Sequence, residues 1–178
     1  MNKNPHLIRM TDNIRKVAGE EKAKEFEENY PLSQSANIQK KYEWAKKACE
    51  FLEENCDDDT IREIREGCIC FDGKSVATKM IQYKDKTQDI AAFAKMFNEK
   101  ESFATIEWIS EHELLYCYPE CYCSCVKRVP ETLPKTWCYC TQGYAKALFR
   151  QVFGKEVEAE LLESVKSGDS RCAVKIRW

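Results

Sequence analysis

Six of the chain's eleven cysteines lie within residues 117–140, a segment that reads CYPECYCSCVKRVPETLPKTWCYC. A cysteine is a small apolar side chain when it is protonated, and a metal ligand or a nucleophile when it is ionised. Three Cys-x-Cys pairs occur in the chain, at residues 68/70, at 121/123 with an extension to 125, and at 138/140. This density and spacing predict a cysteine site that binds a ligand rather than catalyses a reaction.

Three interpretations of the cysteines stay open. Structural zinc takes four ligands in a tetrahedron, usually as pairs from separate segments, so the pairs predict a soft-metal site with zinc as the ion. A redox or nucleophilic set of thiols is the second interpretation, and buried thiols without a function are the third. Four cysteines also suit an iron-sulfur cluster, but the spacings of the usual ferredoxin runs are missing. The predicted metal ligands are Cys121, Cys123, Cys125, Cys138 and Cys140, with Cys68, Cys70 and Cys172 as further contributors.

For a catalytic role, Cys140 is the best candidate nucleophile, because a helix that begins just after it would lower the pKa of its thiol. Its base is harder to find, since His112 is the only histidine outside the N-terminal tail and lies in a predicted turn. The chain has no glycine-rich phosphate loop and no GxSxG or HExxH motif. A cysteine-dependent enzyme, either a thiol redox enzyme or a hydrolase that uses Cys140, is therefore the alternative function.

Aromatic residues crowd the same region as the sulfur atoms, and an aromatic pocket beside a helix start would suit a small organic ligand. The candidate ligand contacts are Tyr118, Trp137 and Tyr144. The sequence therefore predicts a small-molecule or soft-metal binding module with a cysteine-lined site, and it leaves open whether the protein is an enzyme.

The composition favours one soluble globular domain that spans residues 1–178, because 43% hydrophobic and 33% charged residues suit a folded core of this size. A net charge of -2 gives no basic surface for nucleic acid and no polybasic patch for a membrane. The chain has no apolar run long enough to span a bilayer and no secretory apolar segment near its start. We expect a cytoplasmic protein, in which most cysteines stay reduced.

The first hundred residues predict helices. Apolar residues at helical spacing mark one or two helices before residue 30, with a break at Gly19, and then a strong helix at residues 38–55 with Cys49 in its core. Asp57 precedes a short helix that ends at Gly67, as expected of a capping carboxylate. A helical pattern then continues through Met80, and a further helix is predicted at residues 88–97.

Residues 101–178 predict strands and one inserted helix. Alternating apolar residues indicate a hairpin at residues 103–118 and a second hairpin at residues 155–178. Between them, the segment from Cys121 to Cys125 reads as an extended strand, and Thr141 would cap a helix at residues 142–153. The predicted fold is α+β, with N-terminal helices packed with a C-terminal antiparallel sheet of two hairpins and an inserted helix.

The run CYCTQGYAKALFRQVFG, followed by EVEAELLESVKSGDSRCAVKIRW, resembles the C-terminal half of the 4-vinyl-reductase type small-molecule-binding domain. That domain is related in fold to heme-NO-binding domains and Golgi transport-particle subunits. The wider sequence is more similar to an uncharacterised bacterial family with paired CxC motifs. The resemblance covers about residues 100–178 and implies an α+β fold, a ligand pocket between helices and sheet, and a homodimer. The residues that match the pattern are Cys140, Gly143, Gly154, Gly168, Asp169 and Cys172.

Overall fold

The computed structural model describes residues 2–178, which contain seven α-helices and four strands. The chain forms two compact units. The first unit combines the residues up to Cys70 with residues 122–140, and the second combines residues 71–121 with residues 141–178. Among the residues described, no helix is both long and apolar enough to cross a membrane.

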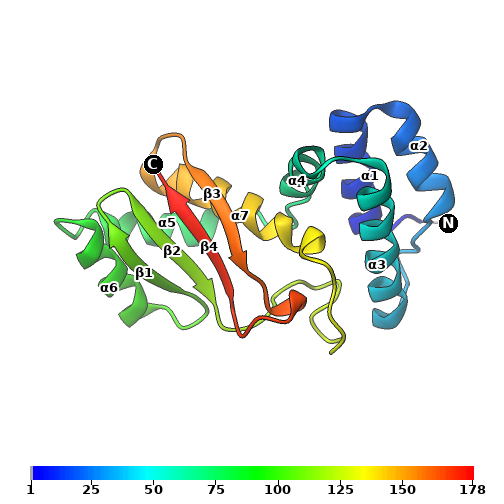
Figure 1. The fold of residues 1–178 in the computed structure, drawn as a ribbon. Coiled ribbons are helices and arrows are strands. Elements are labelled where there is room, and N and C mark those ends of the chain that lie inside the picture. The colour runs from blue at the N-terminus through cyan, green and yellow to red at the C-terminus, as the bar shows by residue number, and fades with distance from the viewer. Residues whose placement is uncertain (1) are drawn as a thin grey trace. The chain divides into compact units, whose positions relative to one another are not determined.

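The first unit is helical, as the sequence predicts (Figure 1). Three of its helices begin at side-chain caps, where Asn4, Asn37 and Asp57 accept hydrogen bonds from backbone N–H groups of the first helical turn. The predicted break at Gly19 is also confirmed, and its φ of +96° lies in a region that favours glycine. The helices are α1 (Pro5–Ala18), α2 (Glu20–Asn29), α3 (Ile38–Asn55), α4 (Asp58–Gly67) and the first residues of α7 (Lys135–Phe153).

Aromatic side chains form the core of the first unit. The ring of Phe26, which is fully buried, lies 5.2 Å from Phe51 and 6.1 Å from Trp44. Trp44 in turn meets Trp137 of α7 edge to face, with the ring centroids 6.0 Å apart. Such contacts add to the free energy gained by burying the rings, so the start of α7 is packed firmly against α3.

The helices α1 and α4 approach each other closely where α4 ends. A Cβ atom on Gly67, the last residue of α4, would lie only 1.8 Å from the side-chain oxygen of Asn13 on α1. The amide group of Asn13 donates a hydrogen bond of 2.8 Å to the backbone oxygen of Arg9. A side chain at position 67 would force the side chain of Asn13 to move, so the glycine allows the end of α4 to lie next to α1 with Asn13 in place.

The second unit is an antiparallel sheet with strand order β1-β2-β4-β3, in which β1 pairs with β2 and β3 pairs with β4 as the two predicted hairpins. The pairing of β2 with β4 joins these hairpins into one sheet. Helices α5, α6 and the second part of α7 lie on one face of the sheet (Figure 1). The bounds are α5 (Lys74–Lys84), α6 (Ile90–Lys100), β1 (Thr105–Ser110), β2 (Glu113–Tyr118), β3 (Glu158–Glu163) and β4 (Cys172–Arg177).

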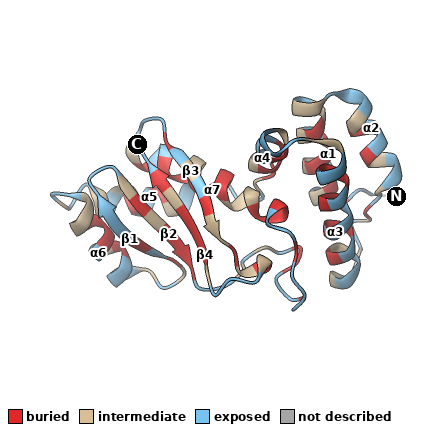
Figure 2. Cartoon of the chain, in the orientation of Figure 1, coloured by how far each residue is buried: buried red, intermediate tan, exposed pale blue. Residues whose placement is uncertain are grey.

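Tyr116 of β2 is the centre of the core in the second unit. Its ring lies 5.3 Å from Phe149 of α7 and 6.1 Å from Phe97 of α6, and all three side chains are fully buried. By contrast, the edge strand β1 leaves most of its residues exposed, with Trp108 at 49% exposure (Figure 2). One buried face and one exposed face are typical of an antiparallel sheet packed on helices, and the predicted α+β fold is confirmed.

Two predicted elements differ from the structure. The segment from Cys121 to Cys125 is not a strand but a loop that ends in tight turns, where Val126 and Lys127 donate backbone hydrogen bonds to the oxygen of Cys123. The helix predicted at residues 142–153 begins instead at Lys135, so Thr141 lies inside it and is not its cap.

Candidate functional site

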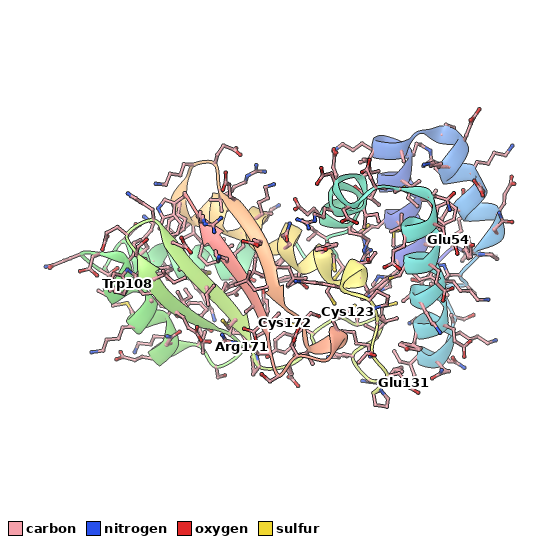
Figure 3. The ribbon with its side chains drawn as sticks, in the orientation of Figure 1. Glu54, Trp108, Cys123, Glu131, Arg171 and Cys172 are labelled. Carbon is pink, nitrogen blue, oxygen red and sulfur yellow. The ribbon has the colours of Figure 1, made fainter. Side chains whose placement is uncertain are left out.

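Four cysteines line one small pocket in the first unit, together with four other residues. The four-cysteine pocket has a volume of about 20 Å³, which is room for one or two groups the size of a water molecule. Cys123 reaches it from the loop that precedes α7 (Figure 3). The lining residues are His6, Arg9, Arg65, Cys68, Cys70, Cys123, Trp137 and Cys140.

Helix geometry places these side chains. Arg65 follows Ile61 by four residues on α4, so it continues the buried stripe of that helix. Cys68 caps the C-terminal end of α4, and its thiol donates a hydrogen bond of 3.3 Å to the oxygen of Ile64. Trp137 and Cys140 are three residues apart on α7 and therefore share one face of it.

Arg65 places a positive charge inside the unit. Arg65 is only 3% exposed, and its Nε donates a hydrogen bond of 3.3 Å to the backbone oxygen of Thr136. One Nη donates to the oxygen of Trp137, and the guanidinium lies 4.3 Å from the centroid of that ring. Burial lowers the pKa of Arg65, whereas the neighbouring cysteines, led by Cys68, raise it when they ionise, and the net shift is upward. The guanidinium is therefore charged at neutral pH.

The thiols around Arg65 do not offset its charge. Burial raises the pKa of Cys140 to about 12, although the positive charge of Arg65 acts in the opposite direction. Burial also raises the pKa of Cys68 against the same opposing charge. Both groups are thus neutral thiols at pH 7, and none of the lining residues that the structure describes is a carboxylate.

His6 is neutral as well. Burial, followed by the positive charges of Arg9, Arg65 and Lys41, lowers the pKa of His6 to about 4. Its Nδ1 lies 3.2 Å from an Nη atom of Arg9, which is always a donor, so Nδ1 accepts and the ring proton is on Nε2. That Nε2 lies 3.5 Å from the hydroxyl of Ser124. The ring is therefore held in one tautomer at the pocket wall.

Some of the predicted binding residues line the pocket, namely Cys68, Cys70, Cys123, Cys140 and Trp137. Two other cysteines of this unit, Cys125 and Cys138, are buried elsewhere in it. Positions two apart on a helix point in nearly opposite directions, which explains why only one member of the pair at 138/140 reaches the pocket. Four further predicted residues belong to the second unit and do not line this pocket: Cys121, Cys172, Tyr118 and Tyr144.

The prediction of zinc was wrong. Within residues 2–178, no group of three or more histidine, cysteine, aspartate and glutamate side chains is placed so that it could hold a metal ion. The four cysteines that line the pocket are therefore not arranged as the tetrahedral set of ligands that a structural zinc site requires.

Cys140 is predicted as a nucleophile because a helix is expected to begin just after it. Because α7 begins at Lys135, Cys140 lies in the second turn and not at the end of the helix dipole. Its catalytic role remains a prediction. His112 is exposed in the turn between β1 and β2, and its ring lies 6.3 Å from that of Trp178 in the second unit.

Three residues that line the pocket were not predicted from the sequence, namely His6, Arg9 and Arg65. His6 was set aside because it lies close to the start of the chain. Arg65 did carry a signal, since Ile61, Ile64 and Arg65 follow the spacing of a buried stripe, and an arginine there must be buried with the isoleucines.

A model of a family of unknown function, DUF6144, matches residues 5–178. This bears out the predicted membership of an uncharacterised family. No curated protein matches the sequence.

Solved structures of H-NOX domains match the chain, as the predicted resemblance to heme-NO-binding domains implies. The H-NOX domain of Shewanella oneidensis in the Fe(II)CO ligation state is 12% identical, covers 98% of this chain and 97% of its own, and has a TM-score of 0.44. The Fe(II) unliganded H-NOX protein of K. algicida is 10% identical, with coverages of 98% and 95% and a TM-score of 0.47.

Proposed function

Because the chain belongs to this family of unknown function, we propose its function from its own residues: it is a small-molecule-binding module whose ligand enters the four-cysteine pocket. Cys68 and Cys70 from the end of α4, Cys123 from the loop and Cys140 from α7 form most of the wall. Thiols are small and polarisable, so such a wall suits a compact organic or sulfur-containing group.

The observation that carries this proposal is the buried charge of Arg65 among neutral thiols. An isolated charge costs several kcal/mol to remove from water unless it is paired. Two backbone oxygens and the face of Trp137 offset part of that cost. A charge held in a small cavity without a carboxylate beside it is an arrangement expected of a binding site.

The experiment that tests the proposal is a screen of small fluorinated fragments that include acids, bases and neutral compounds, with binding detected by ¹⁹F line broadening. We expect fragments whose binding is lost in Cys140→Leu, because the larger side chain fills a cavity of about 20 Å³. Cys56→Leu is the matched control, since Cys56 is half-buried in the same unit and does not line the pocket. The proposal fails if no fragment binds, or if the two variants lose the same fragments equally.

A cysteine-dependent enzyme is the second candidate, because His6 and Cys140 line the same pocket and His6 is neutral at pH 7. Such an enzyme would need a reactive thiolate at neutral pH. The rate of Cys140 alkylation by iodoacetamide between pH 6 and 9 separates the two candidates. The high pKa of this thiol predicts slow alkylation across that range, whereas an enzyme nucleophile would react fast and reach a plateau.

A further inference from the structure

The pocket wall has spare hydrogen-bond donors. Within residues 2–178, Nε1 of Trp137 is buried and has no hydrogen-bond partner, and the same is true of Nε of Arg9. Both groups can only donate. A buried donor without an acceptor destabilises the protein, so each of these two groups is expected to meet an acceptor on a bound ligand.

The charges of the pocket wall also favour an acceptor, and one that carries negative charge. Arg9 and Arg65 bring two positive charges to its wall, whereas His6, Cys68 and Cys140 are neutral at pH 7. The positive charges are not cancelled within the wall, because no carboxylate lines the part of the pocket that the structure describes.

Trp137 connects the charge to the spare donors. The residue is 3% exposed, and its ring is fixed between the guanidinium of Arg65 at 4.3 Å and the ring of Trp44 at 6.0 Å. A ring held on two sides cannot turn its N–H toward another acceptor without breaking these contacts. Trp137 lines the pocket, and its indole N–H is thus a preformed donor without a partner.

We propose that the ligand is an anion of carboxylate size, or a small molecule with one such end. Its oxygen atoms accept hydrogen bonds from Trp137 Nε1 and Arg9 Nε, and its charge lies beside Arg65. The volume of about 20 Å³ favours a planar carboxylate over a tetrahedral phosphate, which is larger. This inference rests on the proposed function and names the chemical class of the ligand.

The test is a titration of the ¹⁵N-labelled chain with formate and, separately, with formamide, which has the same shape without the charge. The four tryptophans give four indole N–H signals, and Trp137→Phe identifies one of them. We expect formate to shift the Trp137 signal downfield in a saturable way, because a charged acceptor forms the stronger hydrogen bond. Formamide and sodium chloride at the same ionic strength should leave it in place, and the signal of the exposed Trp108 should not respond.

Arginine variants test the role of charge. Arg65→Met and Arg9→Gln should each weaken formate binding at least about 10-fold, as expected for the loss of a hydrogen bond or contact with a charged group. Arg9 is only half-buried, so Arg9→Gln provides the test if Arg65→Met does not fold. The matched control is Arg15→Gln, because Arg15 lies on the same helix, pairs with Asp12 and should not affect binding.

The outcomes separate the two proposals. If formate and formamide shift the Trp137 signal equally, the pocket binds small molecules without selecting charge, which overturns the anion and leaves the proposed function standing. If neither compound shifts the signal, the inference that the ligand is an anion is also wrong. The fragment screen then tests the proposed function by itself. If formate shifts the signal but Arg9→Gln and Arg65→Met bind it unchanged, the arginines are not its partners and the inference is wrong.

Discussion

Gly67→Ala tests the close approach of α1 and α4 that positions one side of the pocket. The new methyl carbon would lie 1.8 Å from Oδ1 and 2.6 Å from Cγ of Asn13, so the side chain of Asn13 must move. When it moves, it loses its hydrogen bond of 2.8 Å to the oxygen of Arg9. Overpacking of this kind costs about 1–3 kcal/mol, and the better helix propensity of alanine returns at most about 1 kcal/mol. We therefore expect a net loss of about 1–2 kcal/mol in the free energy of unfolding.

Urea unfolding measured by circular dichroism gives this free energy for four chains: the wild type, Gly67→Ala, Asn13→Ala and the double variant. Because Asn13→Ala removes the atoms in the way, the two changes should not add, and the coupling energy should be at least about 1 kcal/mol. The reasoning is refuted if Gly67→Ala stabilises the protein, as it would at an exposed helix position without a neighbour.

Three further predictions follow from burial, charge and capping. Cys70 is exposed and should react with Ellman's reagent within the mixing time. Cys49, whose pKa burial raises to about 12, should react only when the protein unfolds. Equal rates for the two cysteines in the native protein would contradict the burial of Cys49. The folded state lowers the pKa of His6 from 6.5 to about 4, so its neutral form contributes stability that is present above pH 6.5 and lost as the pH falls toward 4. Urea unfolding of the wild type and His6→Gln at several pH values measures this contribution, and an identical pH dependence of the two chains would contradict it. Asp57→Ala should lower the free energy of unfolding by about 1 kcal/mol, because the N-cap of α4 is lost. The control Asp58→Ala, one residue further on, should lower it less. Equal losses in the two variants would contradict the capping role of Asp57.

Local sequence signals were enough to predict most of the elements. The helix at residues 38–55 has the same bounds in the structure, because its apolar stripe is regular; its cap is Asn37 and not Ser35, which the sequence suggested. The hairpins were predicted from alternation and from turn residues such as Gly168, whose φ of +107° favours glycine. These features depend on neighbours in the sequence and can be read from it.

The start of α7 could not be read in this way. Residues 135–140 contain a tryptophan and two cysteines, which gave no helical signal, and the contact of Trp137 with Trp44 stabilises a helical turn there. Pro134 is compatible with a helix that begins at the next residue, and its oxygen accepts the first backbone hydrogen bond, from Trp137. Packing between residues far apart in the sequence therefore decided this boundary.

The candidate site was predicted in part for the same reason. Cysteine spacing pointed to Cys123 and Cys140, but it could not tell which member of each pair faces the pocket, because that depends on whether the backbone is a strand, a turn or a helix. The zinc prediction failed on this point, since it assumed that paired sulfur atoms point at one centre. The sequence predicted a metal centre, but the buried and charged Arg65 makes the pocket positively charged.

A crystal of the protein soaked in sodium bromide tests most directly whether this pocket binds an anion. Bromide is small and is located by its anomalous scattering. We predict a bromide ion within hydrogen-bond distance of Trp137 Nε1 and beside the guanidinium of Arg65. Bromide ions found only on the outer surface, with none at Trp137 Nε1, would contradict the account.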